Sequence, residues 1–331
     1  MEFVTLADRG LRLSRVGLGT WAIGGGWWGP SDQQDSYTTV RKAIDLGITT
    51  LDTAPIYGFG LSEEVVGQAI RDFGRRDQVI IATKAGLDWS NNKVVRNSSL
   101  PRLIQELEDS LRRLQTDVID LYQIHWPDPV EPIEETAAFL GQLLKQGKIR
   151  AIGVSNFSPA QMERFRQVAP LHTAQPPYNL FERDIEADVL PYCQQQGIHT
   201  LMYSSLCRGL LSGRMNKETT FAAGDMRSGI DPKFTEPRYS QYLKAAAELS
   251  QFAQDRYGKT LPQLAVRWML DRPGVSVALW GARKPHHLDA VAGLWGWSLD
   301  EAAMQTIDRI LQTCIPESIP PSFMAPPVRA A

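Results

Sequence analysis

The feature that most constrains the fold is an alternation of short β-rich runs with amphipathic helical segments along the whole chain. Between the runs, apolar residues recur at helical spacing, as in Leu103, Leu107, Leu111 and Leu114. Eight such alternations predict parallel strands joined by right-handed crossovers, and eight units favour closure into a (β/α)₈ TIM barrel. A doubly wound open sheet is the alternative. The expected strands are Val16–Gly19, Thr49–Thr53, Val79–Thr83, Val118–His125, Ile149–Val154, His172–Gln175, Thr200–Ser204 and Val275–Trp280.

Several helix boundaries carry capping signals in the sequence. Ser158, Thr260 and Ser298 each stand three residues before Gln or Glu, the spacing of a capping box in which two side chains accept the first free amides of a helix. The sequence therefore predicts helices that begin directly after these three residues. Helices are predicted to end at Gly47, Gly147 and Gly197, because glycine tolerates the left-handed backbone geometry that often follows the last turn of a helix.

The segments outside the eight repeats fall into three groups. Glu2–Leu6 and Leu11–Ser14 flank a short turn and predict a hairpin that plugs the bottom of the barrel. Leu87–Ser98 and Leu210–Pro237 are longer than ordinary connections and predict the rim of a pocket. The tail from Pro316 is rich in proline and is expected to be irregular.

The composition is that of an ordinary globular protein. With 331 residues, of which 43% are hydrophobic and 22% charged, the chain can bury a large core, and residues 1–331 are expected to form a single barrel domain. The 35 Lys and Arg nearly balance the 37 Asp and Glu, so no strong field attracts nucleic acid or an anionic membrane. No run reaches the roughly 18 apolar residues of a membrane span, and the first residues lack a signal-peptide pattern. We therefore expect a cytoplasmic protein without nucleic-acid or membrane partners.

Neither the cysteines nor the histidines are spaced for a metal site. Cys193, Cys207 and Cys314 are too few and too scattered for a disulfide framework or a metal knuckle, and we expect reduced thiols. The five histidines include no His-Glu-x-x-His, and the adjacent His286 and His287 would point in different directions. The sequence predicts no bound metal.

Four titratable side chains lie at the ends of neighbouring strands. Asp52 ends the second expected strand, Tyr57 lies just beyond it, Lys84 follows the third strand and His125 closes the fourth. Chemistry in a (β/α)₈ barrel takes place where the strands end, so these side chains are expected to meet at one mouth. Each alone has an ordinary structural explanation, such as a buried ion pair or a core histidine. Together they supply a proton donor, an alkoxide-binding group and support for both, as the reduction of a carbonyl by hydride requires.

The expected roles follow from the acidities of these groups. An unperturbed phenol has a pKa of about 10, and a neighbouring ammonium is expected to lower it. Asp52 would keep Lys84 charged and oriented, and Lys84 would lower the pKa of Tyr57. Tyr57 would then protonate the substrate oxygen while His125 donates a hydrogen bond to it. An acid and a phenol are therefore both needed around the second strand.

Six short motifs occur in order along the chain: Gly17-Leu18-Gly19-Thr20-Trp21, Leu51-Asp52-Thr53-Ala54 with Tyr57-Gly58, Thr83-Lys84, Ile124-His125, Gly153-Val154-Ser155-Asn156-Phe157 and Tyr203-Ser204-Ser205-Leu206. This series resembles the aldo-keto reductases over nearly the whole chain. The resemblance implies NADPH-dependent reduction of aldehydes or ketones, or the reverse oxidation, without a metal. It makes Tyr57 the acid, His125 the orienting group, and Asp52 and Lys84 their support.

The same resemblance implies a site for the nicotinamide. Ser155, Asn156 and Gln175 would hold its amide group. The ring of Tyr203 would stack on the nicotinamide, since an aromatic side chain offers a flat apolar face. The residues expected beside it are Gly19, Thr20 and Trp21.

The phosphates and the adenosine are expected at two later segments. Arg283 and Lys284 resemble the cations that bind the adenosine 2′-phosphate, which favours NADPH. His287 stands where relatives often carry Gln, so use of NADH remains an open alternative. The other residues implied in binding the cofactor are Ser204, Leu206, Arg208, Gly209, Leu210, Arg214, Arg227 and Gly281.

Aromatic residues in the loops at the catalytic end predict the substrate pocket. Flat apolar walls suit a small or aromatic carbonyl or alcohol. The sequence His125-Trp126-Pro127 and the long loop after the seventh strand resemble bacterial members related to the potassium-channel β subunits. An NADPH-binding regulatory module with little turnover is therefore the alternative function, and a monomer is the default oligomeric state. The aromatic residues are Trp27, Trp28, Phe59, Trp89 and Trp126.

Two other interpretations of the motifs are weaker. Gly17, Gly19 and Ala22 fit the spacing of a dinucleotide fingerprint, but that motif must open a helix directly, and a glycine-rich segment intervenes here. Lys84 could be the Schiff-base lysine of an aldolase barrel, but an amine nucleophile must lose its proton, and Asp52 would keep it charged.

Overall fold

The computed structural model describes residues 1–6, 8–89 and 93–329. Its centre is a closed barrel of eight parallel strands, so the expected barrel is confirmed and the open sheet is excluded. Each expected strand is present, with ends that differ by at most two residues. Around the barrel the strands are β3 (Val16–Gly19), β4 (Thr50–Asp52), β5 (Ile80–Ala85), β8 (Ile119–Ile124), β9 (Ile149–Ser155), β10 (Thr173–Gln175), β11 (His199–Met202) and β12 (Val277–Gly281).

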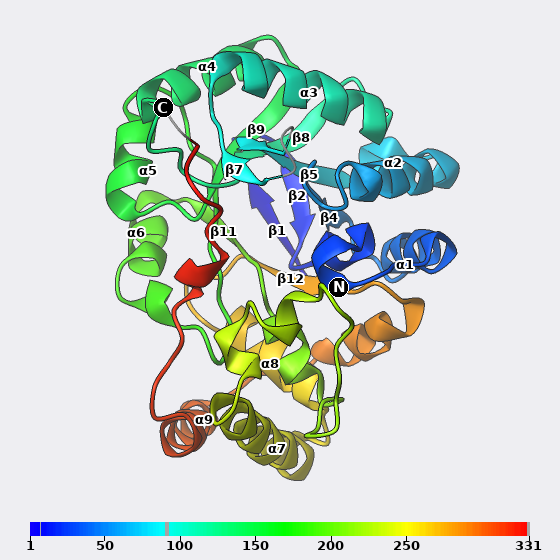
Figure 1. Cartoon of the computed structure of the whole chain (residues 1–331), viewed down its shortest axis with the longest axis vertical. Helices are drawn as coiled ribbons and strands as arrows, with labels where there is room; N and C mark the ends of the chain where they lie inside the picture. The colour runs from blue at the N-terminus through cyan, green and yellow to red at the C-terminus, as the bar shows by residue number, and fades with distance from the viewer. Residues whose placement is uncertain (7, 90–92, 330–331) are drawn as a thin grey trace.

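Helices surround the barrel because one face of each is apolar (Figure 1). In the third helix, Leu103, Leu107 and Leu114 are at most 2% exposed, so most of the leucine stripe seen in the sequence packs against the strands. The helices are α1 (Gln33–Asp45), α2 (Leu61–Phe73), α3 (Leu100–Leu114), α4 (Ile133–Lys145), α5 (Pro159–Arg166), α6 (Val189–Gln196), α7 (Arg238–Tyr257), α8 (Leu261–Leu270) and α9 (Glu301–Cys314).

Two of the three expected capping boxes are confirmed. Ser158 caps α5 and Thr260 caps α8, each paired with a Gln three residues later. The third prediction is wrong, because α9 begins after Asp300 rather than after Ser298. The Asp300 carboxylate accepts the Ala303 N–H at 2.8 Å. Asp is as good an N-cap as Ser, so the sequence offers two caps of similar strength, and the helix uses the later one.

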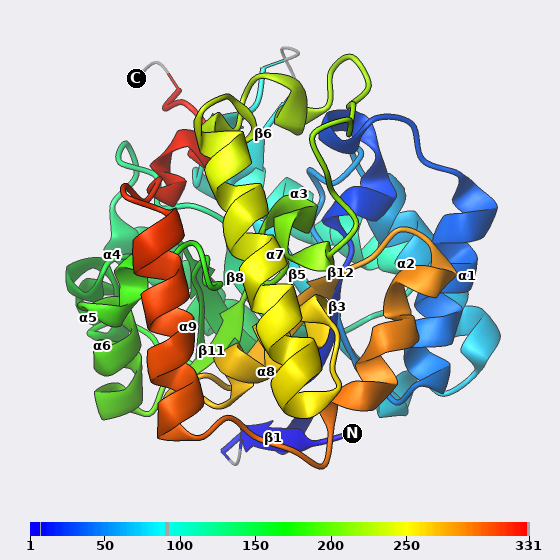
Figure 2. The same cartoon turned by 90° about the horizontal axis from the view of Figure 1, so that it is seen from below.

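The expected N-terminal hairpin is present and closes one end of the barrel. Strands β1 (Phe3–Leu6) and β2 (Leu11–Ser14) pair antiparallel. Leu6, Leu11 and Leu13 are each 1% exposed and pack on the apolar side chains inside the barrel. Figure 2 shows β1 at one end of the molecule and the C-terminal tail at the other, so the hairpin leaves the opposite mouth open for a site.

Both long insertions and the tail lie at that opposite mouth. The first insertion forms a small antiparallel pair, β6 (Leu87–Asp88) and β7 (Val95–Arg96); the expected rim also includes residues 90–92, which lie outside the described residues. The second contains three short 3₁₀ turns, η5 (Cys207–Ser212), η6 (Met226–Ser228) and η7 (Pro232–Phe234). In its described part, residues 316–329, the tail is irregular apart from one 3₁₀ turn, η9 (Pro321–Met324), and an isolated β-bridge between Val328 and Arg96. It thus reaches β7, where the Arg96 N–H donates to the Pro327 carbonyl at 3.0 Å.

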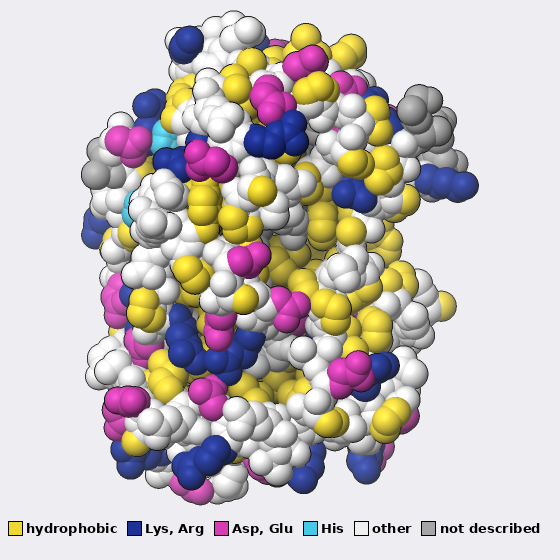
Figure 3. Space-filling view, turned by 90° about the vertical axis from the view of Figure 1, so that its left-hand side faces the viewer, with side chains coloured by type: hydrophobic (Ala, Val, Ile, Leu, Met, Phe, Trp, Pro, Cys, Tyr) yellow, Lys and Arg dark blue, Asp and Glu magenta, His cyan; other side chains and the backbone are white. Residues whose placement is uncertain are grey.

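The surface shows no charge segregation on the face in Figure 3, where side chains of both signs are interspersed around a hollow with hydrophobic side chains. This agrees with the near balance of 35 basic and 37 acidic residues. In the described part of the chain, no helix is both long and apolar enough to cross a membrane.

Candidate active site

The four titratable side chains meet at the open mouth of the barrel. The Lys84 ammonium donates to the Asp52 carboxylate at 2.8 Å and to the Thr53 carbonyl at 2.9 Å. The same ammonium lies 3.3 Å from the Tyr57 hydroxyl. The His125 ring stands edge-on to the ring of Tyr57, with centroids 5.8 Å apart. The tetrad is therefore assembled from β4, β5, the end of β8 and the loop that precedes α2.

Two glutamine amides orient the carboxylate at the base of the site. Gln175 on β10 donates to Asp52 Oδ1 at 2.7 Å, and Gln123 on β8 lies 3.4 Å from the same oxygen. The sequence analysis missed Gln123, although its place two residues before His125 on an alternating strand would have pointed it into the barrel. Asp52 therefore accepts hydrogen bonds on both oxygens and presents its charge to Lys84.

Burial controls the acidity of the tetrad. It raises the pKa of Tyr57 well above the ordinary value, and the nearby negative charge of Asp52 raises it further. The expectation that this pKa is lowered is therefore wrong, because burial and the charge of Asp52 both act in the opposite direction. Burial also lowers the pKa of Lys84, opposed by Asp52. It lowers the pKa of His125 well below the ordinary value, helped by the charge of Lys84, so this imidazole is neutral at physiological pH.

The directions of these pKa shifts predict that the rate of a reaction that uses Tyr57 as an acid varies little with pH. A raised pKa keeps the phenol protonated as the pH rises, and a lowered pKa keeps His125 neutral as the pH falls towards 6. The rate of carbonyl reduction should therefore vary by less than about threefold between about pH 6 and 9. Steady-state rates at saturating substrate across that range measure it. A loss of activity with a midpoint between those limits would contradict the assignment.

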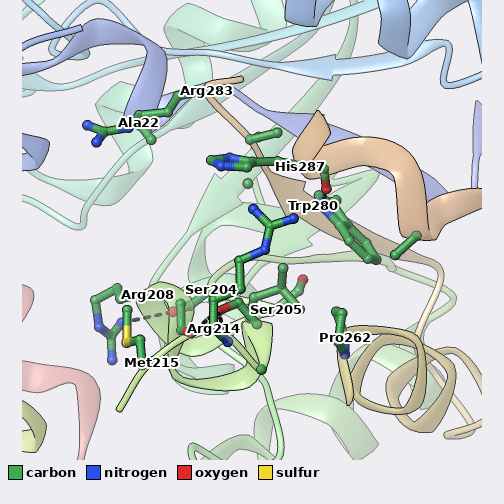
Figure 4. A pocket seen from close by; sticks show the side chains of 18 of the residues that line it. Ala22, Ser204, Ser205, Arg208, Arg214, Met215, Pro262, Trp280, Arg283 and His287 are labelled. Atoms are coloured by element: carbon green, nitrogen blue, oxygen red, sulfur yellow. Dashed lines mark hydrogen bonds between the residues drawn. The ribbon is translucent and has the colours of Figure 1, made fainter. Parts of the chain in front are cut away.

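A large cavity of about 980 Å³ extends from the tetrad between the ends of β11 and β12. Its lining has seven cationic or imidazole side chains and two carboxylates, Asp52 at the inner end and Asp289, which is held by Lys42 at 2.5 Å. Figure 4 shows Arg214 and His287 reaching towards each other from opposite walls. The basic and imidazole side chains in the lining are Arg208, Arg214, Arg227, Lys259, Arg283 and the His286–His287 pair. The cavity is therefore suited to a polyanionic ligand of dinucleotide size.

Twelve residues expected to bind the cofactor line this cavity. Of the others, Thr20 and Leu210 are buried in the core, and Lys284 turns to Asp35, 3.7 Å away. Arg208 reaches the wall, but its guanidinium is paired with Glu182 and Asp231 and donates to Ser204 at 2.8 Å. The twelve in the lining are Gly19, Trp21, Tyr203, Ser204, Leu206, Arg208, Gly209, Arg214, Arg227, Gly281, Arg283 and His287.

A smaller cavity of about 240 Å³ opens on the other side of the tetrad. Trp21, Tyr57 and Tyr203 line both cavities and mark the point where they meet. The polar side chains at its base are Tyr57, His125, Ser155, Asn156, Gln175 and Tyr203. Asn156 accepts from the Tyr203 hydroxyl at 2.8 Å and donates to the His125 carbonyl at 3.0 Å. Three residues expected at the nicotinamide amide thus surround this junction.

The aromatic residues expected to contact substrate are divided between the cavities. Trp27 and Trp126 line the smaller cavity, and Trp28 lines the larger one. Phe59 and Trp89 line neither; their rings contact each other at an angle of 50° with centroids 6.1 Å apart, and Phe59 is 58% exposed. Residues of the second insertion, which was expected to form a pocket rim, also line the smaller cavity. So do residues of the tail, which the sequence analysis missed although apolar side chains among its prolines were an available signal. The residues from these two segments are Met226, Ile230, Phe323, Met324, Pro326 and Pro327.

A closed barrel with a Tyr–Lys–Asp–His tetrad between an apolar pocket and a cation-lined cavity defines a class of barrel oxidoreductases. The model of the Aldo/keto reductase family matches residues 15–312. The chain is 56% identical over 329 residues to the aldo-keto reductase YhdN of Bacillus subtilis, covering 99% of both chains. The chain belongs to the aldo/keto reductase family.

Two solved structures are similar to the whole chain. One is the glycerol dehydrogenase AKR11B4 from Gluconobacter oxydans, with 50% identity, a TM-score of 0.87, and coverage of 98% of this chain and 99% of the other. The second is an aldo-keto reductase from Klebsiella pneumoniae in complex with NADPH, with 30% identity, a TM-score of 0.74, and coverage of 94% and 95%.

Proposed function

We propose that this protein is an NADPH-dependent reductase of aldehydes and ketones, with Tyr57 as the proton donor. The observation that carries the proposal is the position of the Tyr57 hydroxyl, 3.3 Å from the Lys84 ammonium at the junction of the two cavities. A ligand in the large cavity and a substrate in the small one would meet at this hydroxyl.

The lining of the large cavity fits a nicotinamide dinucleotide phosphate. Arg214 and Arg283 supply positive charge along its length, whereas Arg227 is paired with Asp225 at 2.6 Å. The indole N–H of Trp28 is a buried donor without a partner among the described residues. The Klebsiella relative that contains NADPH supports the same ligand here. When bound, the nicotinamide supplies the hydride. Both NADPH and NADH belong in the first assay, because the sequence leaves the choice open.

The residues of the chain handle the proton and the developing charge. Tyr57 donates its proton to the substrate oxygen, and Lys84 donates a hydrogen bond to the resulting phenolate. The neutral His125 ring can donate one N–H to the same substrate oxygen. Because the site is buried, these donors act without competing water and stabilise the alkoxide more than they would in solution.

The smaller cavity favours an uncharged substrate. No Asp, Glu, Lys or Arg is found among its described lining residues, and most of the lining is indole, aliphatic side chains and proline. An unpaired carboxylate in such a pocket costs several kcal/mol. We therefore expect benzaldehyde to be reduced with a kcat/KM at least about tenfold higher than 4-carboxybenzaldehyde, a difference of about 1.4 kcal/mol. NADPH consumption, followed by the absorbance of the reduced nicotinamide, measures both.

These two aldehydes differ only at the ring position opposite the carbonyl, so benzaldehyde serves as the reference for the effect of the carboxylate. Equal kcat/KM values would contradict the proposed pocket. Glycerol and its oxidised counterparts belong in the same panel because of the Gluconobacter relative. Tight NADPH binding with negligible turnover of every carbonyl would instead favour the regulatory module and reject the proposed enzyme.

A further inference from the structure

We propose that Glu63, together with Thr83 and Arg113, is a positioning device that fixes Tyr57 against Lys84; the proposal rests on the reductase function above. None of these three residues lines either cavity, so none is placed to touch substrate or cofactor. Glu63 lies in the first turn of α2, six residues after Tyr57, and Thr83 directly precedes Lys84 on β5.

The Glu63 carboxylate links the helix that follows Tyr57 to the strand that carries Lys84. It is fully buried and accepts a hydrogen bond from the Thr83 hydroxyl at 2.6 Å. Its second oxygen accepts from Arg113 Nε at 2.7 Å, and the Arg113 side chain is only 9% exposed. A buried carboxylate is costly unless both charge and hydrogen bonding are satisfied. Here that requirement fixes α2 in one position relative to β5 and α3.

Arg113 also packs directly on the end of the Tyr57 loop. Gly60, with φ of 105°, has so little space that an added Cβ would lie 2.8 Å from Arg113 Cδ. At Gly67 of α2, a Cβ would lie 2.5 Å from the Arg113 carbonyl. The loop and α2 are therefore pressed against α3 at Arg113, and only glycine permits these approaches.

Ser62 ties the same turn of α2 to the base of the tetrad. Its hydroxyl donates to Thr20 Oγ1 at 2.7 Å and lies 3.0 Å from Thr53 Oγ1. Its backbone N–H donates to the Tyr57 carbonyl at 3.2 Å. Consecutive residues, Ser62 and Glu63, thus connect the Tyr57 loop to β3, β4 and β5. Losing the Glu63 link would let the phenol move relative to the ammonium.

The test compares Glu63→Gln with the parent protein. Gln keeps the size and a hydrogen-bond acceptor for Thr83 but loses the charge that holds Arg113. We expect kcat for benzaldehyde to fall about ten- to hundredfold, because a displacement of about 1 Å in a catalytic group has effects of that order. KM and the NADPH Kd, measured by cofactor fluorescence, should change less than about twofold. Thr83→Val, which removes the hydroxyl without changing the volume much, should act in the same direction.

Asp120 provides a matched control at the opposite end of the barrel. It is a buried carboxylate on β8 that pairs with Arg76 and Arg150, each at 2.7 Å, and accepts the Ile81 N–H at 2.9 Å. Asp120→Asn should lower the denaturation midpoint but leave kcat per folded molecule at the parental value.

Four outcomes decide the proposal. A parental kcat in both Glu63→Gln and Thr83→Val would overturn it, and so would an equal fall of kcat in Asp120→Asn, which would mean a general loss of stability. If Glu63→Gln does not fold, Thr83→Val alone carries the test, and parental turnover in that variant overturns the link to β5. If the parent itself reduces no carbonyl, the reductase function fails instead.

Discussion

Tyr57→Phe is expected to lower kcat for aldehyde reduction by about 10²–10⁴-fold, the contribution of a general acid. The Kd for NADPH should stay within about twofold of the parental value, since the substitution removes only the hydroxyl that bonds to Lys84 and leaves the ring in the lining of the large cavity. Single-turnover reduction rates measure the first quantity, and titration of cofactor fluorescence measures the second.

Tyr122→Phe is the matched control for this substitution. Tyr122 lies on β8 with its hydroxyl buried and without a hydrogen-bond partner in the described chain. Removing that hydroxyl should leave kcat unchanged. If Tyr57→Phe reduced aldehydes as fast as the parent, Tyr57 would not be the acid, and the proposed mechanism would fail.

Lys84→Met should remove activity and destabilise the fold together. Lys84 is completely buried and Asp52 is 3% exposed, so the substitution leaves a carboxylate in the barrel without its cation. Breaking one side of such a pair costs about 3–5 kcal/mol. Urea denaturation should show that loss in the free energy of unfolding. NADPH consumption should fall at least about a hundredfold, because the phenolate left by proton transfer loses its hydrogen-bond donor.

Adding Asp52→Asn to Lys84→Met separates the two effects. The double variant no longer buries an unpaired charge, so more than half of the lost stability should return. Activity should not return, since neither substitution restores a cation beside Tyr57. Recovery of turnover in the double variant would show that the ammonium is not required for the chemistry.

The parts of the fold that follow from short-range patterns were correctly predicted. The runs that became β3 to β5 and β8 to β12 carry β-rich sequence, and α3 carries its leucines at helical spacing. Capping at Ser158 and Thr260 was also predicted, because a cap depends on residues three apart. At α9 two competing caps lay two residues apart, and the sequence pattern alone chose the wrong one.

Side chains whose role depends on distant partners were harder to predict. Arg208 fitted a phosphate-binding segment, yet Glu182 and Asp231, both distant in sequence, occupy its guanidinium. The tail was expected only to be irregular, but Phe323 and Met324 line the smaller cavity. No local pattern encodes these contacts, because they depend on where remote loops end after the barrel closes.

The sequence by itself determined the barrel and the membership of the tetrad, because strand periodicity and the placement of polar residues at strand ends are local properties of the chain. Only the tertiary structure decided how acidic those groups are. The pKa of Tyr57 depends on the depth of burial and on the distance to Asp52, and both arise when β4, β5 and α2 pack together. The same packing brings Glu63 to Thr83, a contact between helix and strand that no spacing along the chain reveals.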